Sequence, residues 1–154
     1  MSWYQRANSD RLATILQSKI KDIIASANLA AIAEKVRSLH ERPNGIPKSL
    51  IGEVDDFSIY IVDGDAVKTK LEMDFVEGAN DEAYSSETDD EHKDVIPDNE
   101  IWLSAEVHER YMPYILYHEL LEAIIMRSTG LAYSDAHDVA NRYEKKARES
   151  KIFG

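Results

Sequence analysis

The fold is decided by residues 113–129, which read PYILYHELLEAIIMRST. Apolar residues recur in this stretch at helical spacing, Pro113 suits the first turn of a helix, and Gly130 supplies a stop. One side of the predicted helix is apolar and consists of Tyr114, Tyr117, Leu120, Leu121, Ile124 and Ile125. The opposite side of the helix carries Glu119, Ala123 and Arg127, which are expected to point away from the apolar side. The segment therefore predicts an amphipathic helix that runs from Pro113 to Thr129 and packs on the core.

Two side chains on the border of this helix can bind a metal ion. His118 and Glu122 are four residues apart, so they project side by side from one face. An imidazole nitrogen and a carboxylate oxygen both ligate divalent metals such as zinc. Glu119 stands where an H-E-x-x-H motif places its general base, so it is the candidate catalytic residue. The alternative is a buried polar network in which His118 hydrogen-bonds Glu122 or Glu144.

A second helix is expected from Ser134, as its N-cap, to about Ser150. It carries His137, the third candidate ligand, and two histidines with one carboxylate are a common catalytic zinc set. Asn141 and Glu144 share the face of His137 and are expected to hydrogen-bond a ligand. A short turn joins the two helices, so they should pack closely. Three protein ligands leave an open position for a water whose pKa the metal lowers, which predicts metal-dependent hydrolysis.

The sequence does not decide which histidine or tyrosine would stabilise an oxyanion. A developing oxyanion needs a hydrogen-bond donor, and nothing in the sequence selects among Tyr111, Tyr114, Tyr133 and His108. His108 is also a backup ligand. His40 ends a predicted helix, where a cation suits the dipole, and needs no other role. His92 is expected in a loop.

The N-terminal part predicts helices. Ser9–Leu39 carries an apolar stripe at helical spacing with a break at Ser26-Ala27-Asn28, which fits one bent helix or two consecutive helices. Two prolines and a glycine in residues 42–47 end this region. We interpret it as packing structure, with a partner-binding or dimerisation helix as the alternative.

A small sheet is expected next. Phe57–Val62 and Ala66–Val76 predict two strands of a hairpin, joined by the turn signal Asp63-Gly64-Asp65. Ile101–Leu103 is a third strand candidate. The expected class is α+β, with N-terminal helices, a small sheet and two C-terminal helices that carry the site. The length of 154 residues fits a single domain, residues 1–154.

Glu77–Glu100 is acidic and contains few apolar residues, which predicts a long mobile loop. Five of its carboxylates could bind cations, namely Glu82, Glu87, Asp89, Asp90 and Glu91, but a solvated loop is the preferred interpretation. Their spacing does not match an EF-hand. A long loop beside an active site often forms a lid or a substrate wall.

Composition excludes several function classes. The formal net charge is -11, which repels nucleic-acid phosphates and anionic membranes and suits a cation or a basic protein partner. The absence of cysteine excludes disulfides and thiolate metal sites. The first residues lack an apolar signal core, and no stretch is apolar enough to span a bilayer. The expectation is therefore a cytoplasmic protein.

These motifs together resemble the zincin-like metallopeptidases. The chain also resembles small uncharacterised phage and bacterial proteins with an Ile-Trp strand, here Ile101-Trp102, an H-E-x-x-E helix, and a Gly-Leu-x-Tyr-x-x-Ala-His segment, here residues 130–137. The resemblance implies a mixed sheet packed on the site helix. Zincins normally carry a second histidine where this chain has Glu122, so the ligand set would be His118, Glu122 and His137. A carboxylate at that position shifts the metal preference toward harder ions such as manganese.

Three functions are compatible with the sequence. The leading one is a zinc-dependent, peptidase-like hydrolase that acts on a peptide or protein. The alternative is a non-catalytic acidic protein, phage-encoded or bacterial, that keeps a zincin-like fold and binds a basic protein. The third, which only the charge suggests, is an inhibitor that mimics DNA.

Overall fold

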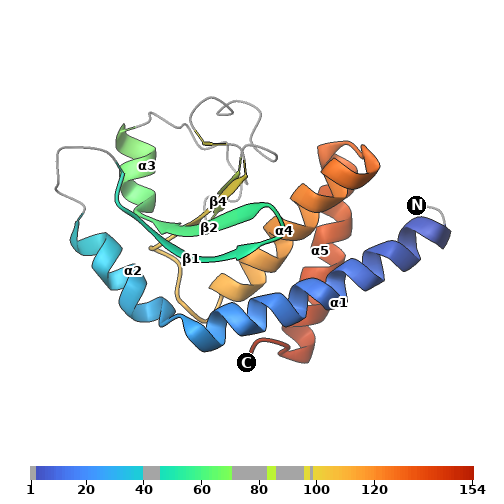
Figure 1. Ribbon diagram of the computed structural model, residues 1–154, viewed down its shortest axis with the longest axis horizontal. Coiled ribbons are helices and arrows are strands. Elements are labelled where there is room, and N and C mark those ends of the chain that lie inside the picture. The colour runs from blue at the N-terminus through green and yellow to red at the C-terminus, as the bar shows by residue number, and fades with distance from the viewer. Residues whose placement is uncertain (1–2, 40–45, 71–82, 86–95, 98) are drawn as a thin grey trace.

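The computed structural model describes residues 3–39, 46–70, 83–85, 96–97 and 99–154 (Figure 1). The elements in this part of the chain are α1 (Trp3–Ser26), α2 (Leu29–Ser38), β1 (Lys48–Val54), β2 (Phe57–Val62), α3 (Gly64–Lys70), β3 (Ala83–Ser85), β4 (Glu100–Ser104), α4 (Met112–Thr129) and α5 (Tyr133–Ser150). The predicted α+β class is confirmed. Among the described helices, none combines the length and the apolar content that crossing a bilayer requires.

The N-terminal region forms two consecutive helices, one of the two forms that the sequence allowed. The break falls at Ala27 and Asn28. Asn28 caps α2, because its side-chain oxygen accepts a hydrogen bond from the backbone N–H of Ala31 at 3.1 Å. The cap satisfies a donor that the first turn of α2 cannot pair internally, so the chain restarts as a new helix.

The four strands form one mixed sheet in the order β1-β2-β4-β3. β1 runs antiparallel to β2, β2 runs parallel to β4, and β3 runs antiparallel to β4. The predicted strands Phe57–Val62 and Ile101–Leu103 are confirmed as β2 and as part of β4. Parallel strands need a crossover connection, and α3 lies in the connection between β2 and β4.

The predicted strand Ala66–Val76 is wrong in its first five residues, which lie in α3, while residues 71–76 are outside the described chain. Asp63 starts a helix instead of a hairpin turn. Its side-chain oxygen accepts from the N–H of Ala66 at 3.1 Å, and its carbonyl accepts from the N–H of Val67 at 3.1 Å. The antiparallel partner of β2 is therefore β1, which the sequence analysis did not predict.

Part of the predicted acidic loop is ordered structure. β3 lies within residues 77–100, Ile96 is fully buried, and Glu100 begins β4, so a continuous loop is wrong at these positions. β3 pairs with β4, and Ile96 packs in the cluster of Val62, Val67 and Trp102. The remaining predictions for this region lie outside the described residues, as does the one for His40; they concern Glu82, Glu87, Asp89, Asp90, Glu91 and His92.

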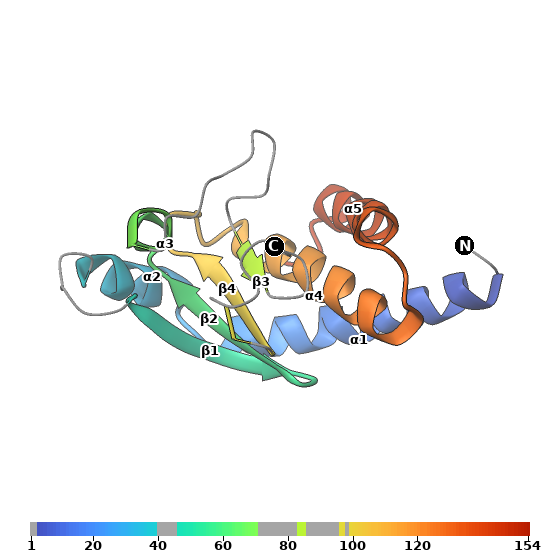
Figure 2. The ribbon, with the colours of Figure 1, turned by 90° about the horizontal axis from the view of Figure 1, so that it is seen from above.

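The sheet has a core on each face. One face packs on α1 and α4 through side chains such as Phe57, Ile59 and Leu103. On the other face, Trp102 and Val62 pack with Val67 of α3. Figure 2 shows α4 between α1 and α5. This position places the site helix at the centre of the molecule.

The central position of α4 corrects the amphipathic pattern that the sequence predicted. Glu119 and Ala123, which were expected to point away from the core, are 4% and 0% exposed. Only Arg127, near the end of the helix, is exposed as expected. The sheet, α1 and α5 surround α4, so no side of its middle turns faces solvent.

Gly52 lets α1 lie against β1. A Cβ atom at this position would stand 2.8 Å from Cγ1 and 3.0 Å from Cδ1 of Ile23. We expect Gly52→Ala to lower the free energy of unfolding by about 1–3 kcal/mol, because the buried Ile23 must shift. Denaturant unfolding measures this loss. In Gly52→Ala combined with Ile23→Ala the added cost should be smaller than the sum of the two single changes, and strict additivity would contradict the proposed clash.

Candidate metal centre

Three ligand atoms from two helices converge on one point. His118 Nε2 and Glu122 Oε1 come from α4 and are in direct contact. His137 Nδ1 comes from α5 and lies 2.6 Å from Glu122 Oε1 and 3.3 Å from His118 Nε2. The three residues form a group whose ligand atoms all lie within 4.8 Å of one another. The structure thus brings together the three residues that the sequence proposed as a ligand set.

The connection between α4 and α5 sets this geometry. Gly130 ends α4 with φ of 72°, a left-handed conformation that glycine adopts without steric cost. α5 then begins at Tyr133 with Ala132 as its N-cap, so the prediction of Ser134 as N-cap is wrong. The buried residues of α5 are small or branched, namely Ala136, Val139, Ala140 and Ala147. Their small size lets the helices approach closely.

The spacing of the two histidines suits a tetrahedral metal site. Bonds of about 2.0–2.1 Å at tetrahedral angles separate two zinc-bound nitrogens by about 3.3 Å. The 3.3 Å between His118 Nε2 and His137 Nδ1 agrees with that value. Glu122 Oε1 lies closer to both rings, in direct contact with Nε2 of His118 and 2.6 Å from Nδ1 of His137.

The two ligand residues of α4 are buried, so their charges must be balanced by neighbouring side chains. His118 is 3% exposed and Glu122 is 1% exposed. Burial alone lowers the pKa of His118, but the contacts with Glu122 and Glu144 outweigh it and raise the pKa to about 10. The nearby charge of Glu119 contributes in the same direction. The carboxylates around His118 thus favour its protonated form, and a metal would bind in place of that proton.

Glu144 supports His118 from the side opposite the ligand atom. Its Oε1 lies 2.8 Å from Nδ1 of His118, and its Oε2 accepts a hydrogen bond from Nε of Arg148 at 2.8 Å. Burial raises the pKa of Glu144, but His118 and Arg148 together lower it below its usual value. Nδ1 is fully buried and has no well-directed hydrogen bond within the described chain, so Glu144 is held there by charge and proximity. A carboxylate behind a ligating histidine is a common feature of zinc sites.

Asn141 does not contact the site as Glu144 does. Its side chain is exposed on α5, and no hydrogen bond joins it to the site in the part of the chain that the structure describes. Arg148, in contrast, was not singled out from the sequence. Its spacing of four residues from Glu144 is the signal that could have identified it, because such pairs meet on one helix face.

Of the four oxyanion-stabilising candidates, only Tyr133 lies beside the ligand atoms. Its hydroxyl is 3.5 Å from His137 Nδ1, and its ring is 43% exposed. The Tyr114 hydroxyl accepts from the backbone N–H of Phe153 at 3.3 Å, and Tyr111 packs beneath arginine side chains. His108 accepts from the N–H of Arg110 in the turn before α4, so it is no backup ligand.

Comparisons with known proteins add no family to this geometry. No protein-family model matches the chain, and searches of the curated proteins and of the solved structures find no significant match. The resemblance to the zincin-like metallopeptidases therefore stays a prediction, and the residues of the site carry the functional argument.

Proposed function

We propose that this chain is a divalent-metal-dependent hydrolase, zinc being the expected metal, in which His118, Glu122 and His137 hold the ion. The observation that carries the proposal is the convergence of the three ligand atoms from α4 and α5. Two of these residues are buried, while the side chain of His137 is 34% exposed. A ligand set with one partly exposed member suits a catalytic site, which needs a route for substrate.

The residues around the metal position have separate tasks. A divalent ion held by three protein ligands lowers the pKa of a water and polarises a carbonyl group. Glu119 would accept a proton from that water and return it to the leaving group. The hydroxyl of Tyr133, 3.5 Å from Nδ1 of His137, is the proposed donor to an oxyanion at this position. The carboxylate of Glu122 also admits harder ions such as manganese.

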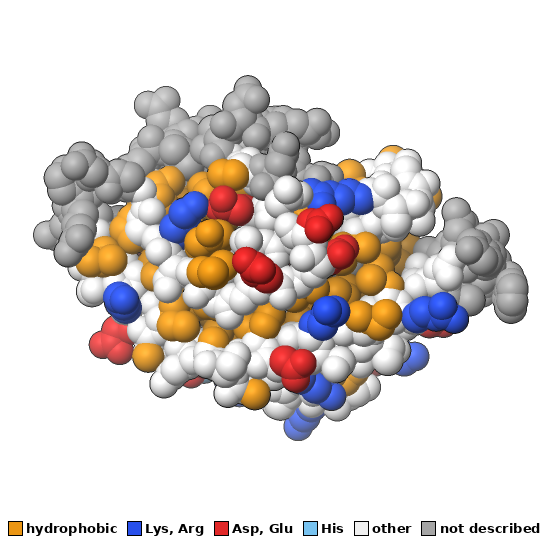
Figure 3. Space-filling model, in the orientation of Figure 1, with side chains coloured by type: hydrophobic (Ala, Val, Ile, Leu, Met, Phe, Trp, Pro, Cys, Tyr) orange, Lys and Arg blue, Asp and Glu red, His pale blue; other side chains and the backbone are white. Residues whose placement is uncertain are grey.

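The peptidase-like part of the proposal rests on the resemblance of the H-E-x-x-E helix and of residues 130–137 to zincins. A peptide or protein is accordingly the proposed substrate class. The net negative charge suits a basic partner but does not identify a binding surface for one. Figure 3 shows acidic and basic side chains interspersed on the face in view, without one acidic field there.

A metal titration tests the proposal. The untagged protein is titrated with zinc and with manganese, and its metal content is measured by elemental mass spectrometry. We expect about one equivalent of metal per chain. The control is Asp65→Asn with Glu106→Gln, which removes two carboxylates of a separate acidic group around Asp63. This variant should bind the same amount.

Two results would overturn the proposed metal site. In the first, the wild type takes up no metal after zinc addition. His118, Glu122 and His137 would then form a metal-free network with Glu144. In that network the carboxylates of Glu122 and Glu144 balance the charge of His118. In the second, metal uptake is lost in the Asp65 and Glu106 variant and not in variants of the ligand set.

Removal of the charge of Glu144 is expected to weaken zinc binding about 10–100-fold, the usual cost of losing a carboxylate behind a histidine ligand. Glu144→Gln keeps the size of the side chain but no longer orients and polarises the His118 ring. Competition with a chromogenic chelator measures the affinity. Asn141→Ala, on the same helix, is the matched control and should be unchanged. Equal affinities for Glu144→Gln and the wild type would remove Glu144 from this role.

A further inference from the structure

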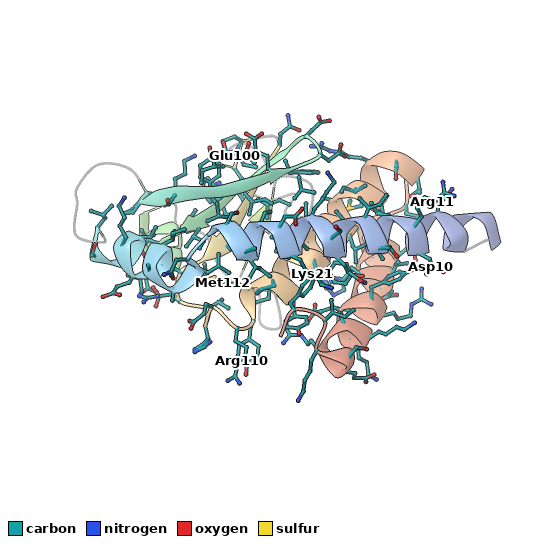
Figure 4. All side chains as sticks on the ribbon, turned by 60° about the horizontal axis from the view of Figure 1, so that its bottom comes forward. Asp10, Arg11, Lys21, Glu100, Arg110 and Met112 are labelled. Atoms are coloured by element: carbon teal, nitrogen blue, oxygen red, sulfur yellow. The ribbon has the colours of Figure 1, made fainter. Side chains whose placement is uncertain are left out.

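A cavity of about 370 Å³ lies between the start of α4 and the end of α5. Its lining consists of Arg110, Tyr111, Tyr114, Arg148, Lys151 and Gly154. Figure 4 shows Arg110 in the turn that precedes Met112, at the beginning of α4. Three of the lining side chains are cationic and none is acidic, although the whole chain has a net charge of -11. Such a concentration of positive charge suits an anionic group.

The two arginines of the cavity lie over aromatic rings. The guanidinium of Arg148 lies over the rings of Tyr111 and Tyr114 at 5.5 and 5.2 Å, and that of Arg110 lies over Tyr111 at 5.2 Å. Arg148 is already paired with Glu144. Arg110 and Lys151 have no acidic side chain as a partner in the described chain.

Tyrosine hydroxyls add a neutral donor to the cavity. The Tyr114 oxygen accepts the backbone N–H of Phe153, which leaves its own proton for another acceptor. A guanidinium, an ammonium and a phenol proton together match the oxygens of a carboxylate.

The cavity and the metal position share one edge of the α4–α5 pair. On α4, Tyr114 precedes His118 by four residues and Tyr111 precedes it by seven, so all three lie on one face. On α5, Arg148 follows His137 by eleven residues, again on one face. At a rise of 1.5 Å per residue, the seven residues on α4 span about 10 Å and the eleven residues on α5 span about 16 Å. An extended peptide covers these distances with about three to five residues.

We propose that this cavity binds a carboxylate of an acidic peptide that lies along the edge between α4 and α5, about three to five residues from the bond to be cleaved. The position of that bond rests on the proposed hydrolase function, whereas binding of the carboxylate does not. Arg110 and Lys151 bind the carboxylate, and Arg148 stays engaged with Glu144.

The test compares three N-acetylated alanine hexapeptides. The first contains one glutamate and ends in an amide, the second has glutamine in place of the glutamate, and the third has no glutamate but keeps its free terminal carboxylate. Binding to the full chain is measured by isothermal titration with a chelator present, so that no hydrolysis occurs. Comparison of the first and third peptides distinguishes a side-chain carboxylate from a terminal one.

We expect at least one of the two carboxylate peptides to bind about fivefold or more tightly than the glutamine peptide, with the preference falling as salt is added. Arg110→Gln with Lys151→Gln should abolish this preference. The control is Arg142→Gln with Lys145→Gln, which removes the same charge from exposed positions of α5 that do not line the cavity. Equal binding of all three peptides would overturn the proposal. An equal loss in the control variant would also overturn it, since the preference would then reflect net charge alone.

Failure of the proposed function gives a different result. If the zinc-loaded chain cleaves none of the peptides but the carboxylate preference depends on Arg110 and Lys151, the cavity assignment is upheld and the hydrolase proposal fails. If the zinc-loaded chain cleaves all three peptides with the same KM, hydrolysis is upheld and the proposed carboxylate site fails.

Discussion

Replacement of His137 by alanine is expected to weaken zinc binding by at least about 100-fold, more than the loss of a group that only supports a ligand. His137 supplies one of three converging ligand atoms, so its loss leaves a two-ligand site. The fold should tolerate the change, because the side chain is 34% exposed and Glu122 keeps its contact with His118. Chelator competition gives the affinity, and thermal unfolding of the metal-free chain checks the fold.

His118→Ala is a less informative test of the same site. It removes the partner that is shared by Glu122, which is buried, and Glu144, whose side chain is 22% exposed. Breaking such a buried arrangement costs about 3–5 kcal/mol, so loss of metal and loss of fold would coincide. Glu122→Gln avoids this problem because it keeps the shape of the side chain, and it too should lose zinc.

An exposed histidine, His108, is the control for the His137 experiment. His108→Ala removes a ring that lies outside the site, and its zinc affinity should equal that of the wild type. An unchanged affinity in His137→Ala would exclude His137 as a ligand. It would leave His118 and Glu122 as a hydrogen-bonded pair within a structural network.

The sequence predicted the proximity of His118, Glu122 and His137 better than it predicted the sheet. The spacing of His118 and Glu122 follows directly from the helical repeat, and the short connection after Gly130 limits where His137 can lie. The strand predicted from Ala66 was wrong over Ala66–Lys70, because alternation over a few residues does not distinguish a strand from a short helix, and the Asp63 cap decided the outcome there.

Other features depend on tertiary contacts that a single sequence does not display. β1 has a register irregularity between Leu50 and Gly52, which interrupts the alternation by which a strand is recognised. The burial of Glu119 depends on how the sheet, α1 and α5 surround α4. Tyr133 was one of four equivalent candidates until the start of α5 placed its hydroxyl beside His137.

Glu119→Gln is expected to lower the hydrolysis rate by about 10²–10⁴-fold while zinc stays bound. Glutamine has the size of glutamate but cannot accept a proton from a water at neutral pH. Glu119 is not among the three converging ligand residues, so metal affinity should change little. The new termini released from a peptide library, counted by mass spectrometry with zinc-loaded protein, measure the rate.

The buried position of Glu119 makes its control essential. Glu109→Gln removes the same charge from an exposed residue shortly before α4 and should leave the rate unchanged. Wild-type activity in Glu119→Gln would show that another group carries the proton. Loss of zinc together with activity would show that the Glu119 charge acts through the metal site, since it already acts on His118 in the metal-free chain. Retained zinc with lost hydrolysis separates proton transfer from metal binding, and it would make Glu119 the catalytic base that the H-E-x-x-E spacing predicts.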